Sequence, residues 1–263
     1  MKKIKTSELK FGDVLFYNRN SFISRAIKMF DGSDYSHSGI YFNGSVLEAV
    51  GSGVAKHPIA ESIKDVIFVD VYRYMANDRG LIGDAKYPAQ AIGDVIAKYE
   101  KEGDRYAYES ILLFAMLCTT RKIHIPFVSW MVRNTLESAL TVVNKIIAMG
   151  KQPMICSELV FRCFTEALPK DRYDIFITGA DSMKEMPETL AAPKNKNFIA
   201  TDEDISEINK LKSEFLAKMV QSKGIKSHDK SMKTLMKSLA VPDFVSPRDL
   251  CTSRNFVKIG RLE

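Results

Sequence analysis

Apolar and polar residues alternate in short runs near the N-terminal end of the chain, and these runs predict strands joined by tight turns. A turn at Gly12-Asp13 precedes an apolar run that ends at Tyr17. The runs His37–Phe42 and Val46–Val50 flank Asn43-Gly44, a dipeptide that favours the two-residue turn between antiparallel strands. We therefore expect a β-hairpin here, and another strand over residues 66–74.

Apolar residues at helical spacing dominate the rest of the chain and predict a set of packed helices. Between residues 109 and 150 the pattern predicts a helical hairpin, because the apolar run at 111–118 is too short to cross a bilayer and residues 129–149 carry several charged residues. Membrane insertion of this region is the less favoured alternative. The predicted helices are residues 21–30, 84–101, 111–118, 129–149, a segment starting near 156, and a segment starting near 201.

The length and composition indicate one globular domain of ordinary soluble-type composition, and the predicted strands and helices together place it in the α+β class. The chain has 263 residues, of which 46% are hydrophobic and 27% charged, and a modest net charge of +6. We expect residues 1–263 to form a single domain with a helical insertion at about 109–150 and a Lys-rich helical segment at about 200–240. The basic N-terminus is not followed by an apolar segment, so we expect a cytoplasmic location, with secretion by a specialised system left open.

The Lys-rich segment bears on possible partners. It holds eight lysines from Lys210 to Lys237 against only two acidic residues, Glu214 and Asp229. A solvated face is the favoured interpretation, and peripheral contact with anionic lipid or with an acidic partner is the alternative. Aromatic residues are almost absent there, so nucleic-acid binding has no support. The sequence leaves the oligomeric state open.

Four cysteines and four histidines are present, but they do not form a metal-binding pattern. Without export the thiols are expected to be reduced. Cys156 and Cys163 would lie about 10 Å apart along one helix and could not form a disulfide. No cysteine pair has the spacing of zinc ligands, so we expect neither a metal nor another cofactor.

Cys156 is the first candidate for chemistry. Pro153 lies just before it, and apolar residues follow at helical spacing, so Cys156 falls near the start of a buried helix. The N-terminus of a helix favours the thiolate and therefore a reactive sulfur. A cysteine that only packs as a small apolar residue is the common alternative.

His37 and Glu48 form the second candidate. Pairing centred on Asn43-Gly44 places residue 42 opposite 45 and residue 37 opposite 50, so Glu48 lies diagonal to His37 on the same face. A diagonal Cβ separation of about 7 Å suits a carboxylate that orients an imidazole. A thiol nucleophile needs such a base, and the base needs such a partner.

The other histidines, Glu158 and Tyr35 are weaker candidates for a catalytic role. We expect three histidines to be surface residues in loops or polar segments, with an entrance position for His124 left open. We expect Glu158 to be a charge in the first turn of its helix. Tyr35 could reach the oxyanion or the substrate, but the local pattern does not fix its direction. The three histidines are His57, His124 and His228.

Several motifs together resemble a known family. They occur in the order Gly12-Asp-Val14, Ser33-Asp-Tyr-Ser-His-Ser-Gly-Ile-Tyr41, Val46-Leu-Glu-Ala49, Gly51-Ser-Gly-Val54, Gly103-Asp-Arg-Tyr-Ala107 and Ile155-Cys-Ser-Glu-Leu159. The chain resembles the circularly permuted papain-like cysteine hydrolases of the NlpC superfamily, YiiX-type branch, in which His precedes Cys as it does in lecithin retinol acyltransferase. The resemblance covers about residues 9–107, 153–168 and 246–250.

This resemblance implies a permuted papain-like fold in which an antiparallel sheet packs against helices. It also implies a Cys156 nucleophile, a His37 base and an orienting Glu48. The expected function is hydrolysis of an amide or ester in a peptide, a cell-wall amide or an acyl lipid, through a thioacyl-enzyme. Two alternatives stay open: a lipid acyltransferase or phospholipase, and a catalytically silent module that binds a membrane or a protein.

Overall fold

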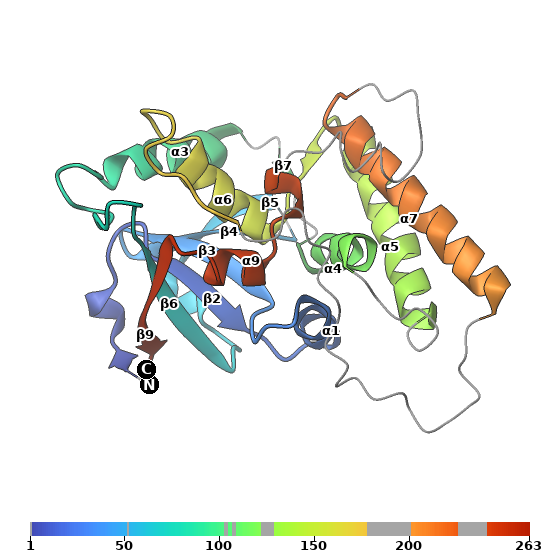
Figure 1. Ribbon diagram of the computed structural model, residues 1–263, viewed down its shortest axis with the longest axis horizontal. Coiled ribbons are helices and arrows are strands. Elements are labelled where there is room, and N and C mark those ends of the chain that lie inside the picture. The colour runs from blue at the N-terminus through green and yellow to red at the C-terminus, as the bar shows by residue number, and fades with distance from the viewer. Residues whose placement is uncertain are drawn as a thin grey trace.

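The computed structural model describes residues 2–51, 53–102, 105–106, 109–121, 129–177, 201–225 and 241–263. His124, His228 and the second half of the Lys-rich segment lie outside the described residues. Helices and a sheet are both present, as the α+β prediction requires, and Figure 1 shows the sheet with most helices on one side of it.

Seven strands form the main sheet. Their order across the sheet is β1 (Lys3–Ile4), β9 (Phe256–Leu262), β6 (Phe68–Tyr74), β2 (Val14–Asn18), β3 (His37–Phe42), β4 (Ser45–Val50) and β5 (Gly53–Pro58). All neighbours are antiparallel except β1 and β9, which are parallel, so the sheet is mixed and departs from the predicted antiparallel arrangement at this edge. The strand β5 was not predicted, because the glycines Gly51 and Gly53 were interpreted as the end of the hairpin.

The two faces of the sheet are buried in different ways. The larger core contains Phe16, Ile40 and Leu47 from the sheet together with the helices α1 (Phe22–Asp31), α3 (Gln90–Glu102), α4 (Glu109–Thr120) and α6 (Cys156–Thr165). The smaller core contains Leu15, Tyr17 and Val46 on the opposite face, where the short helix α2 (Ile59–Ser62) covers the sheet. This division decides which side chains can meet.

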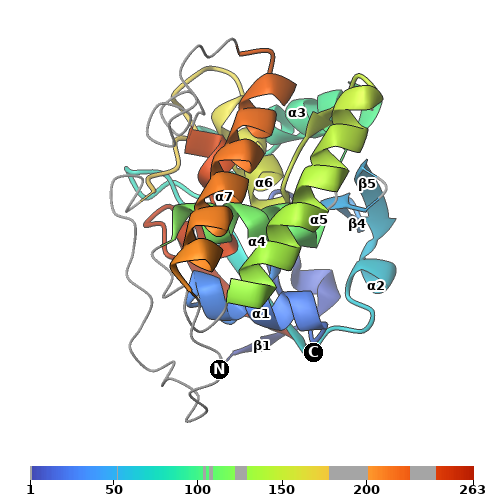
Figure 2. The same cartoon turned by 90° about the vertical axis from the view of Figure 1, so that its right-hand side faces the viewer.

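Two long helices form an outer layer. The helices α5 (Ser129–Ala148) and α7 (Asp202–Ser222) lie side by side and both contact α4 (Figure 2). The N-cap of α7 is Thr201, whose side chain accepts a hydrogen bond from the backbone N–H of Asp204 at 3.1 Å, so the helix begins where it was expected. Among the described helices, none combines the length and the apolar character that a membrane span requires.

The helix α3 begins later than predicted. Residues 84–87 form a turn, closed by a hydrogen bond from the N–H of Tyr87 to the carbonyl of Asp84 at 2.9 Å, and α3 starts at Gln90. Pro88 disfavours a helical conformation at the residue before it, which explains the delay. The smaller elements are η1 (Thr6–Glu8), β7 (Arg105–Tyr106), β8 (Gln152–Pro153), η4 (Val241–Phe244) and α9 (Pro247–Cys251), with β7 and β8 paired in parallel.

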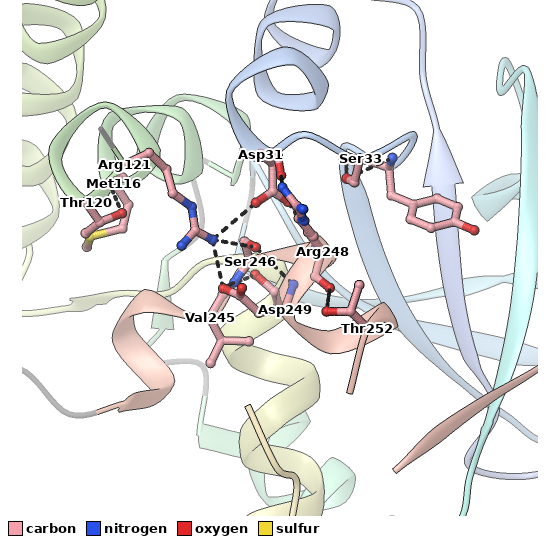
Figure 3. A network of polar contacts seen from close by, with 12 residues as sticks. Asp31, Ser33, Met116, Thr120, Arg121, Val245, Ser246, Arg248, Asp249 and Thr252 are labelled. Carbon is pink, nitrogen blue, oxygen red and sulfur yellow. Dashed lines mark hydrogen bonds and ion pairs between the residues drawn. The ribbon is translucent and has the colours of Figure 1, made fainter. Parts of the chain in front are cut away.

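A polar network attaches the C-terminal segment to the helical layer (Figure 3). Arg121, just after α4, contacts Asp31 at 3.3 Å and Asp249 at 2.9 Å, and donates to the hydroxyl of Ser246 at 3.0 Å. Burial raises the pKa of Asp31, while Ser246 and Arg121 oppose that rise. The network connects α1, α4 and α9, three elements that are distant in sequence.

The described half of the Lys-rich segment is not a uniform solvated face. Lys212 is only 7% exposed and packs within the helical layer, where burial lowers its pKa. Lys223 also points inward, whereas Lys210 is exposed. The prediction of a solvated face therefore holds for only part of this helix.

Candidate functional site

The β3–β4 hairpin brings His37 and Glu48 together as predicted. Phe42 pairs with Ser45 and Gly39 pairs with Glu48, so Glu48 lies diagonal to His37. The distance between His37 Nε2 and Glu48 Oε2 is 2.6 Å, and each side chain is 1% exposed. The turn chemistry at Asn43-Gly44 was therefore sufficient to predict this contact.

Gly39 leaves the space through which Glu48 reaches His37. A Cβ atom added at Gly39 would lie 2.7 Å from Cγ1 of Val46 and 3.1 Å from Cγ of Glu48. Any larger residue would therefore push the Glu48 side chain away from its diagonal position. A glycine at this strand position therefore permits the contact between His37 and Glu48.

Aromatic and polar groups enclose the pair. The Tyr17 ring lies 5.0 Å from the His37 ring, and the Tyr17 and Ser62 hydroxyls form a hydrogen bond of 2.5 Å. Arg19 Nη2 lies 3.4 Å from Glu48 Oε2, and Arg19 is one-third exposed. The pair is thus shielded from water and has one cationic neighbour at its edge.

The charge of Glu48 follows from these neighbours. Burial alone would raise the pKa of this carboxyl, but the hydrogen bond and charge of His37, together with Ser62 and Arg19, lower the pKa below its ordinary value. Glu48 is therefore an anion at neutral pH. A carboxylate at Nε2 holds the proton on that nitrogen and leaves Nδ1, which is also buried, as the nitrogen that can act as a base.

His57 is not the loop residue that the sequence suggested. It lies in β5, where it pairs with Val46 and so shares the face of Glu48. His57 Nδ1 lies 3.6 Å from Glu48 Oε1, and its side chain is 34% exposed. A hollow of about 350 Å³ opens beside it, lined by Arg19, Glu48, Val50, His57, Glu61, Ser62, Lys64 and Asp65.

Cys156 begins α6, as predicted. Ile155 is the N-cap, and its backbone N–H donates to the carboxylate of Glu158 at 3.4 Å, so Glu158 is a first-turn charge as expected. The thiol has no exposed surface. Its position at a helix N-terminus is the one that stabilises a thiolate.

Cys156 and His37 lie on opposite faces of the hairpin. Residues that pair across antiparallel strands share a face, and His37 pairs with Tyr17 of the smaller core. Cys156 belongs to the larger core, with Ile40 and Ala49 of the same two strands. The structure thus brings together two of the three predicted residues, and it places the third behind the sheet.

A buried ion-pair cluster fixes the start of α6. Glu158 Oε1 lies 2.8 Å from Arg162 Nε and 2.9 Å from Lys223 Nζ, and Lys223 also lies 2.8 Å from Asp243 Oδ1. Sequence reasoning missed Lys223 because it lies 65 residues from Glu158. The end of the outer helix α7 is thereby attached to the helix that carries Cys156.

The remaining candidates have structural partners. The hydroxyl of Tyr35 donates a hydrogen bond to Asp70 at 2.8 Å and is buried there, which fixes the direction that the sequence left open.

The other three cysteines are not activated. Burial raises the pKa of Cys118 and of Cys163, and it raises the pKa of Cys251 to about 12. These three thiols are therefore protonated and unreactive at neutral pH.

The described residues contain no group of three or more His, Cys, Asp or Glu side chains arranged to hold a metal ion. The expectation that the protein uses no metal or other cofactor stays a prediction.

The similarity of the chain to known proteins is limited to distant structural resemblance. No family model matches the chain, and no curated protein matches it. Among solved structures, the chain is similar to the crystal structure of the metalloprotein YiiX from Escherichia coli O157:H7, with 14% sequence identity and a TM-score of 0.43. The match covers 96% of this chain and 97% of that one.

Proposed function

We propose that the protein is a cysteine hydrolase of the permuted papain-like type, which cleaves an amide or ester through a thioacyl-enzyme. The observation that supports this most is the buried contact of 2.6 Å between His37 and Glu48. An imidazole oriented by an ionised carboxylate is the base that a thiol nucleophile requires. Cys156, at the start of a helix that packs on β3 and β4, is the nucleophile in this proposal.

The chemistry assigns one role to each residue. His37 Nδ1 takes the thiol proton of Cys156, the thiolate attacks the substrate carbonyl, and the resulting oxyanion is stabilised by backbone N–H groups at the start of α6. His37 then gives the proton to the leaving amine or alcohol as the carbon–leaving-group bond breaks. In the second half His37 deprotonates water, which attacks the thioester and releases the acid and the thiol.

This route requires the sulfur and Nδ1 to meet. His37 is the first residue of β3, so the proposal requires a change at the end of this strand that turns the imidazole toward the α6 face while Glu48 stays its partner. The proposal therefore includes a rearrangement at the start of β3 when the substrate binds.

A second candidate follows from the hollow, which lies on the face of the His37–Glu48 pair and not on that of Cys156. Here His37 would act as a general base toward water, which attacks the carbonyl directly without a covalent intermediate. In this candidate the thiol of Cys156 only packs in the larger core.

Single substitutions distinguish the two candidates. Hydrolysis of a panel of activated amides and esters should fall by about 10³-fold or more in both Cys156→Ala and His37→Ala if the thiol is the nucleophile. Loss in His37→Ala with an active Cys156→Ala would establish the water route. Activity that survives both substitutions would overturn both candidates. Cys163→Ala, in the same helix, is the matched control.

The acceptor and the substrate class are also proposals. An acyltransferase or phospholipase would use the same thioacyl-enzyme but pass the acyl group to an acceptor other than water. Labelled acyl lipid with and without an added alcohol or amine acceptor tests this, since label released only as free acid excludes transfer. If the protein is a catalytically silent binding module, neither substrate type should be turned over. Its binding to lipid vesicles would then test for peripheral membrane contact.

A further inference from the structure

Glu48 has a second imidazole beside it, on the opposite side from His37. His57 Nδ1 lies 3.6 Å from Oε1, while His37 Nε2 lies 2.6 Å from Oε2. The two histidines come from different strands, β5 and β3, and β4 carries the carboxylate between them. One carboxylate thus lies within reach of two imidazole side chains.

The two carboxylate oxygens of Glu48 differ in the hydrogen bonds that they accept. Oε2 interacts with His37 and lies near Arg19, whereas Oε1 is buried and accepts no well-formed hydrogen bond from the described residues. The nearby Ser62 hydroxyl is held by Tyr17 at 2.5 Å. A buried acceptor that lacks a donor carries a desolvation penalty. A movement of less than 1 Å by His57 Nδ1 would bring it to hydrogen-bond distance.

His57 is also the member of this group that water can reach. Its side chain is 34% exposed, whereas those of His37 and Glu48 are 1% exposed. It lines the hollow, so it can exchange protons with solvent directly. The charged or titratable groups that face it come from β3, β4, the β2–α1 connection, and α2 with the turn after it: Tyr41, His37, Glu48, Arg19, Glu61, Lys64 and Asp65.

We propose that His57 is a positioning residue that competes with His37 for the Glu48 carboxylate. When His57 is neutral, the Glu48 carboxylate interacts with His37 alone. When His57 binds a proton, it draws Oε1 toward itself and its positive charge disfavours a second proton on His37. The partly exposed histidine thereby sets how readily the buried one is protonated. The catalytic consequence rests on the proposed hydrolase function, but the coupling between the two histidines does not.

The coupling can be measured without any substrate. We would follow the imidazole signals of the folded full-length protein by NMR from pH 5 to 8, and assign the four histidines by single substitutions. In His57→Gln the titration midpoint of His37 should rise by on the order of one pH unit, because a competing cation is removed. In His57→Lys, which keeps a cation at all these pH values, the midpoint should fall.

Lys56→Gln is the matched control, because Lys56 is the preceding residue of β5 and lies over the Phe42 ring on the opposite face. It should leave the His37 midpoint unchanged. Equal midpoints in the wild type, His57→Gln and His57→Lys would overturn the inference, whether or not the protein is a hydrolase.

Activity adds a separate readout. In His57→Gln the acidic limb of the kcat/KM profile should move in the same direction as the His37 midpoint. A moved NMR midpoint with an unmoved limb would overturn the catalytic consequence alone. Absence of hydrolysis in the wild type at every pH would count against the proposed function and leave the titration result standing.

Discussion

The two faces of the β3–β4 hairpin differ in the kind of interaction that each side chain makes. One face carries His37 and Glu48, joined at 2.6 Å in the smaller core. The other carries Ile40 and Leu47 and packs against the helix that starts at Cys156. All four of these side chains are buried, so the contrast is not one of exposure. It shows that one hairpin can bury a His–Glu pair on one side while it supports, on the other, the helix that begins at Cys156.

The largest expected effect concerns the polar face. Glu48→Gln keeps the shape of the side chain but removes the charge that holds the proton on His37 Nε2. Hydrolysis should fall by about 10²–10⁴-fold, because the imidazole loses its required tautomer. The rate constants of purified protein on an activated ester measure this.

Glu61→Gln, on the rim of the hollow, is the matched control and should keep most of the activity. If Glu48→Gln and Glu61→Gln were equally active, the polar face would have no catalytic role.

Gly39→Ala perturbs the same face through the backbone. The added Cβ would meet Val46 at 2.7 Å and Glu48 at 3.1 Å, so Glu48 must move from its diagonal position. We expect about a tenfold or greater loss of activity together with about 1–3 kcal/mol of stability, as for other overpacked sites. Kinetics and urea unfolding would report the two effects separately.

Gly51→Ala provides the comparison, since nothing lies within 4 Å of a Cβ built there. An unaltered Gly39→Ala protein would show that the hairpin has more room than the structure indicates.

Lys223→Met tests how the helix on the apolar face is held. It removes one cation from the buried Glu158 and Asp243 carboxylates, which keep Arg162 as a partner. The free energy of unfolding should fall by about 1–3 kcal/mol, since a charged hydrogen-bond partner is lost in a buried site. Lys218→Met, in the helix α7 that Lys223 directly follows, should change it by less than about 0.5 kcal/mol. Equal stability of the two variants would mean that α7 does not secure α6.

The smallest expected effect is the pH dependence of stability. The pKa of Glu48 is lowered in the folded protein, so its ionisation stabilises the fold at pH values above its unfolded pKa of about 4.3. That contribution is lost as pH falls through the lower, folded pKa. Urea unfolding of the wild type and of Glu48→Gln from pH 7 to 3 should therefore converge at acidic pH. Parallel curves over the whole range would contradict the lowered pKa.

How much of this could be predicted from the sequence depends on the distance between the residues involved. The Asn43-Gly44 turn fixes the hairpin register, and with it the His37–Glu48 contact, within a dozen residues. The start of α6 at Cys156 was also predicted from its neighbours alone. Local patterns therefore gave both halves of the candidate site.

The relation between those halves could not be predicted. Whether α6 covers the face of His37 or the other one depends on more than a hundred intervening residues, and no local pattern encodes that choice. The resemblance to permuted papain-like hydrolases led us to expect the three residues on one side. His57 was missed for a different reason: Gly51, Gly53 and Pro58 obscured β5, and the position of His57 beside Glu48 comes only from that pairing.

The central claim is that the thiol of Cys156 and the imidazole of His37 belong to one site although they lie on two faces of the sheet. The most direct measurement is the rate at which a small neutral alkylating agent modifies each cysteine of the folded protein at neutral pH, resolved by mass, in the wild type and in His37→Gln. Our account predicts that Cys156 reacts faster than Cys251 in the wild type and about tenfold or more slowly in His37→Gln. Modification of Cys156 at the same rate in both proteins, or no faster than that of Cys251, would contradict it.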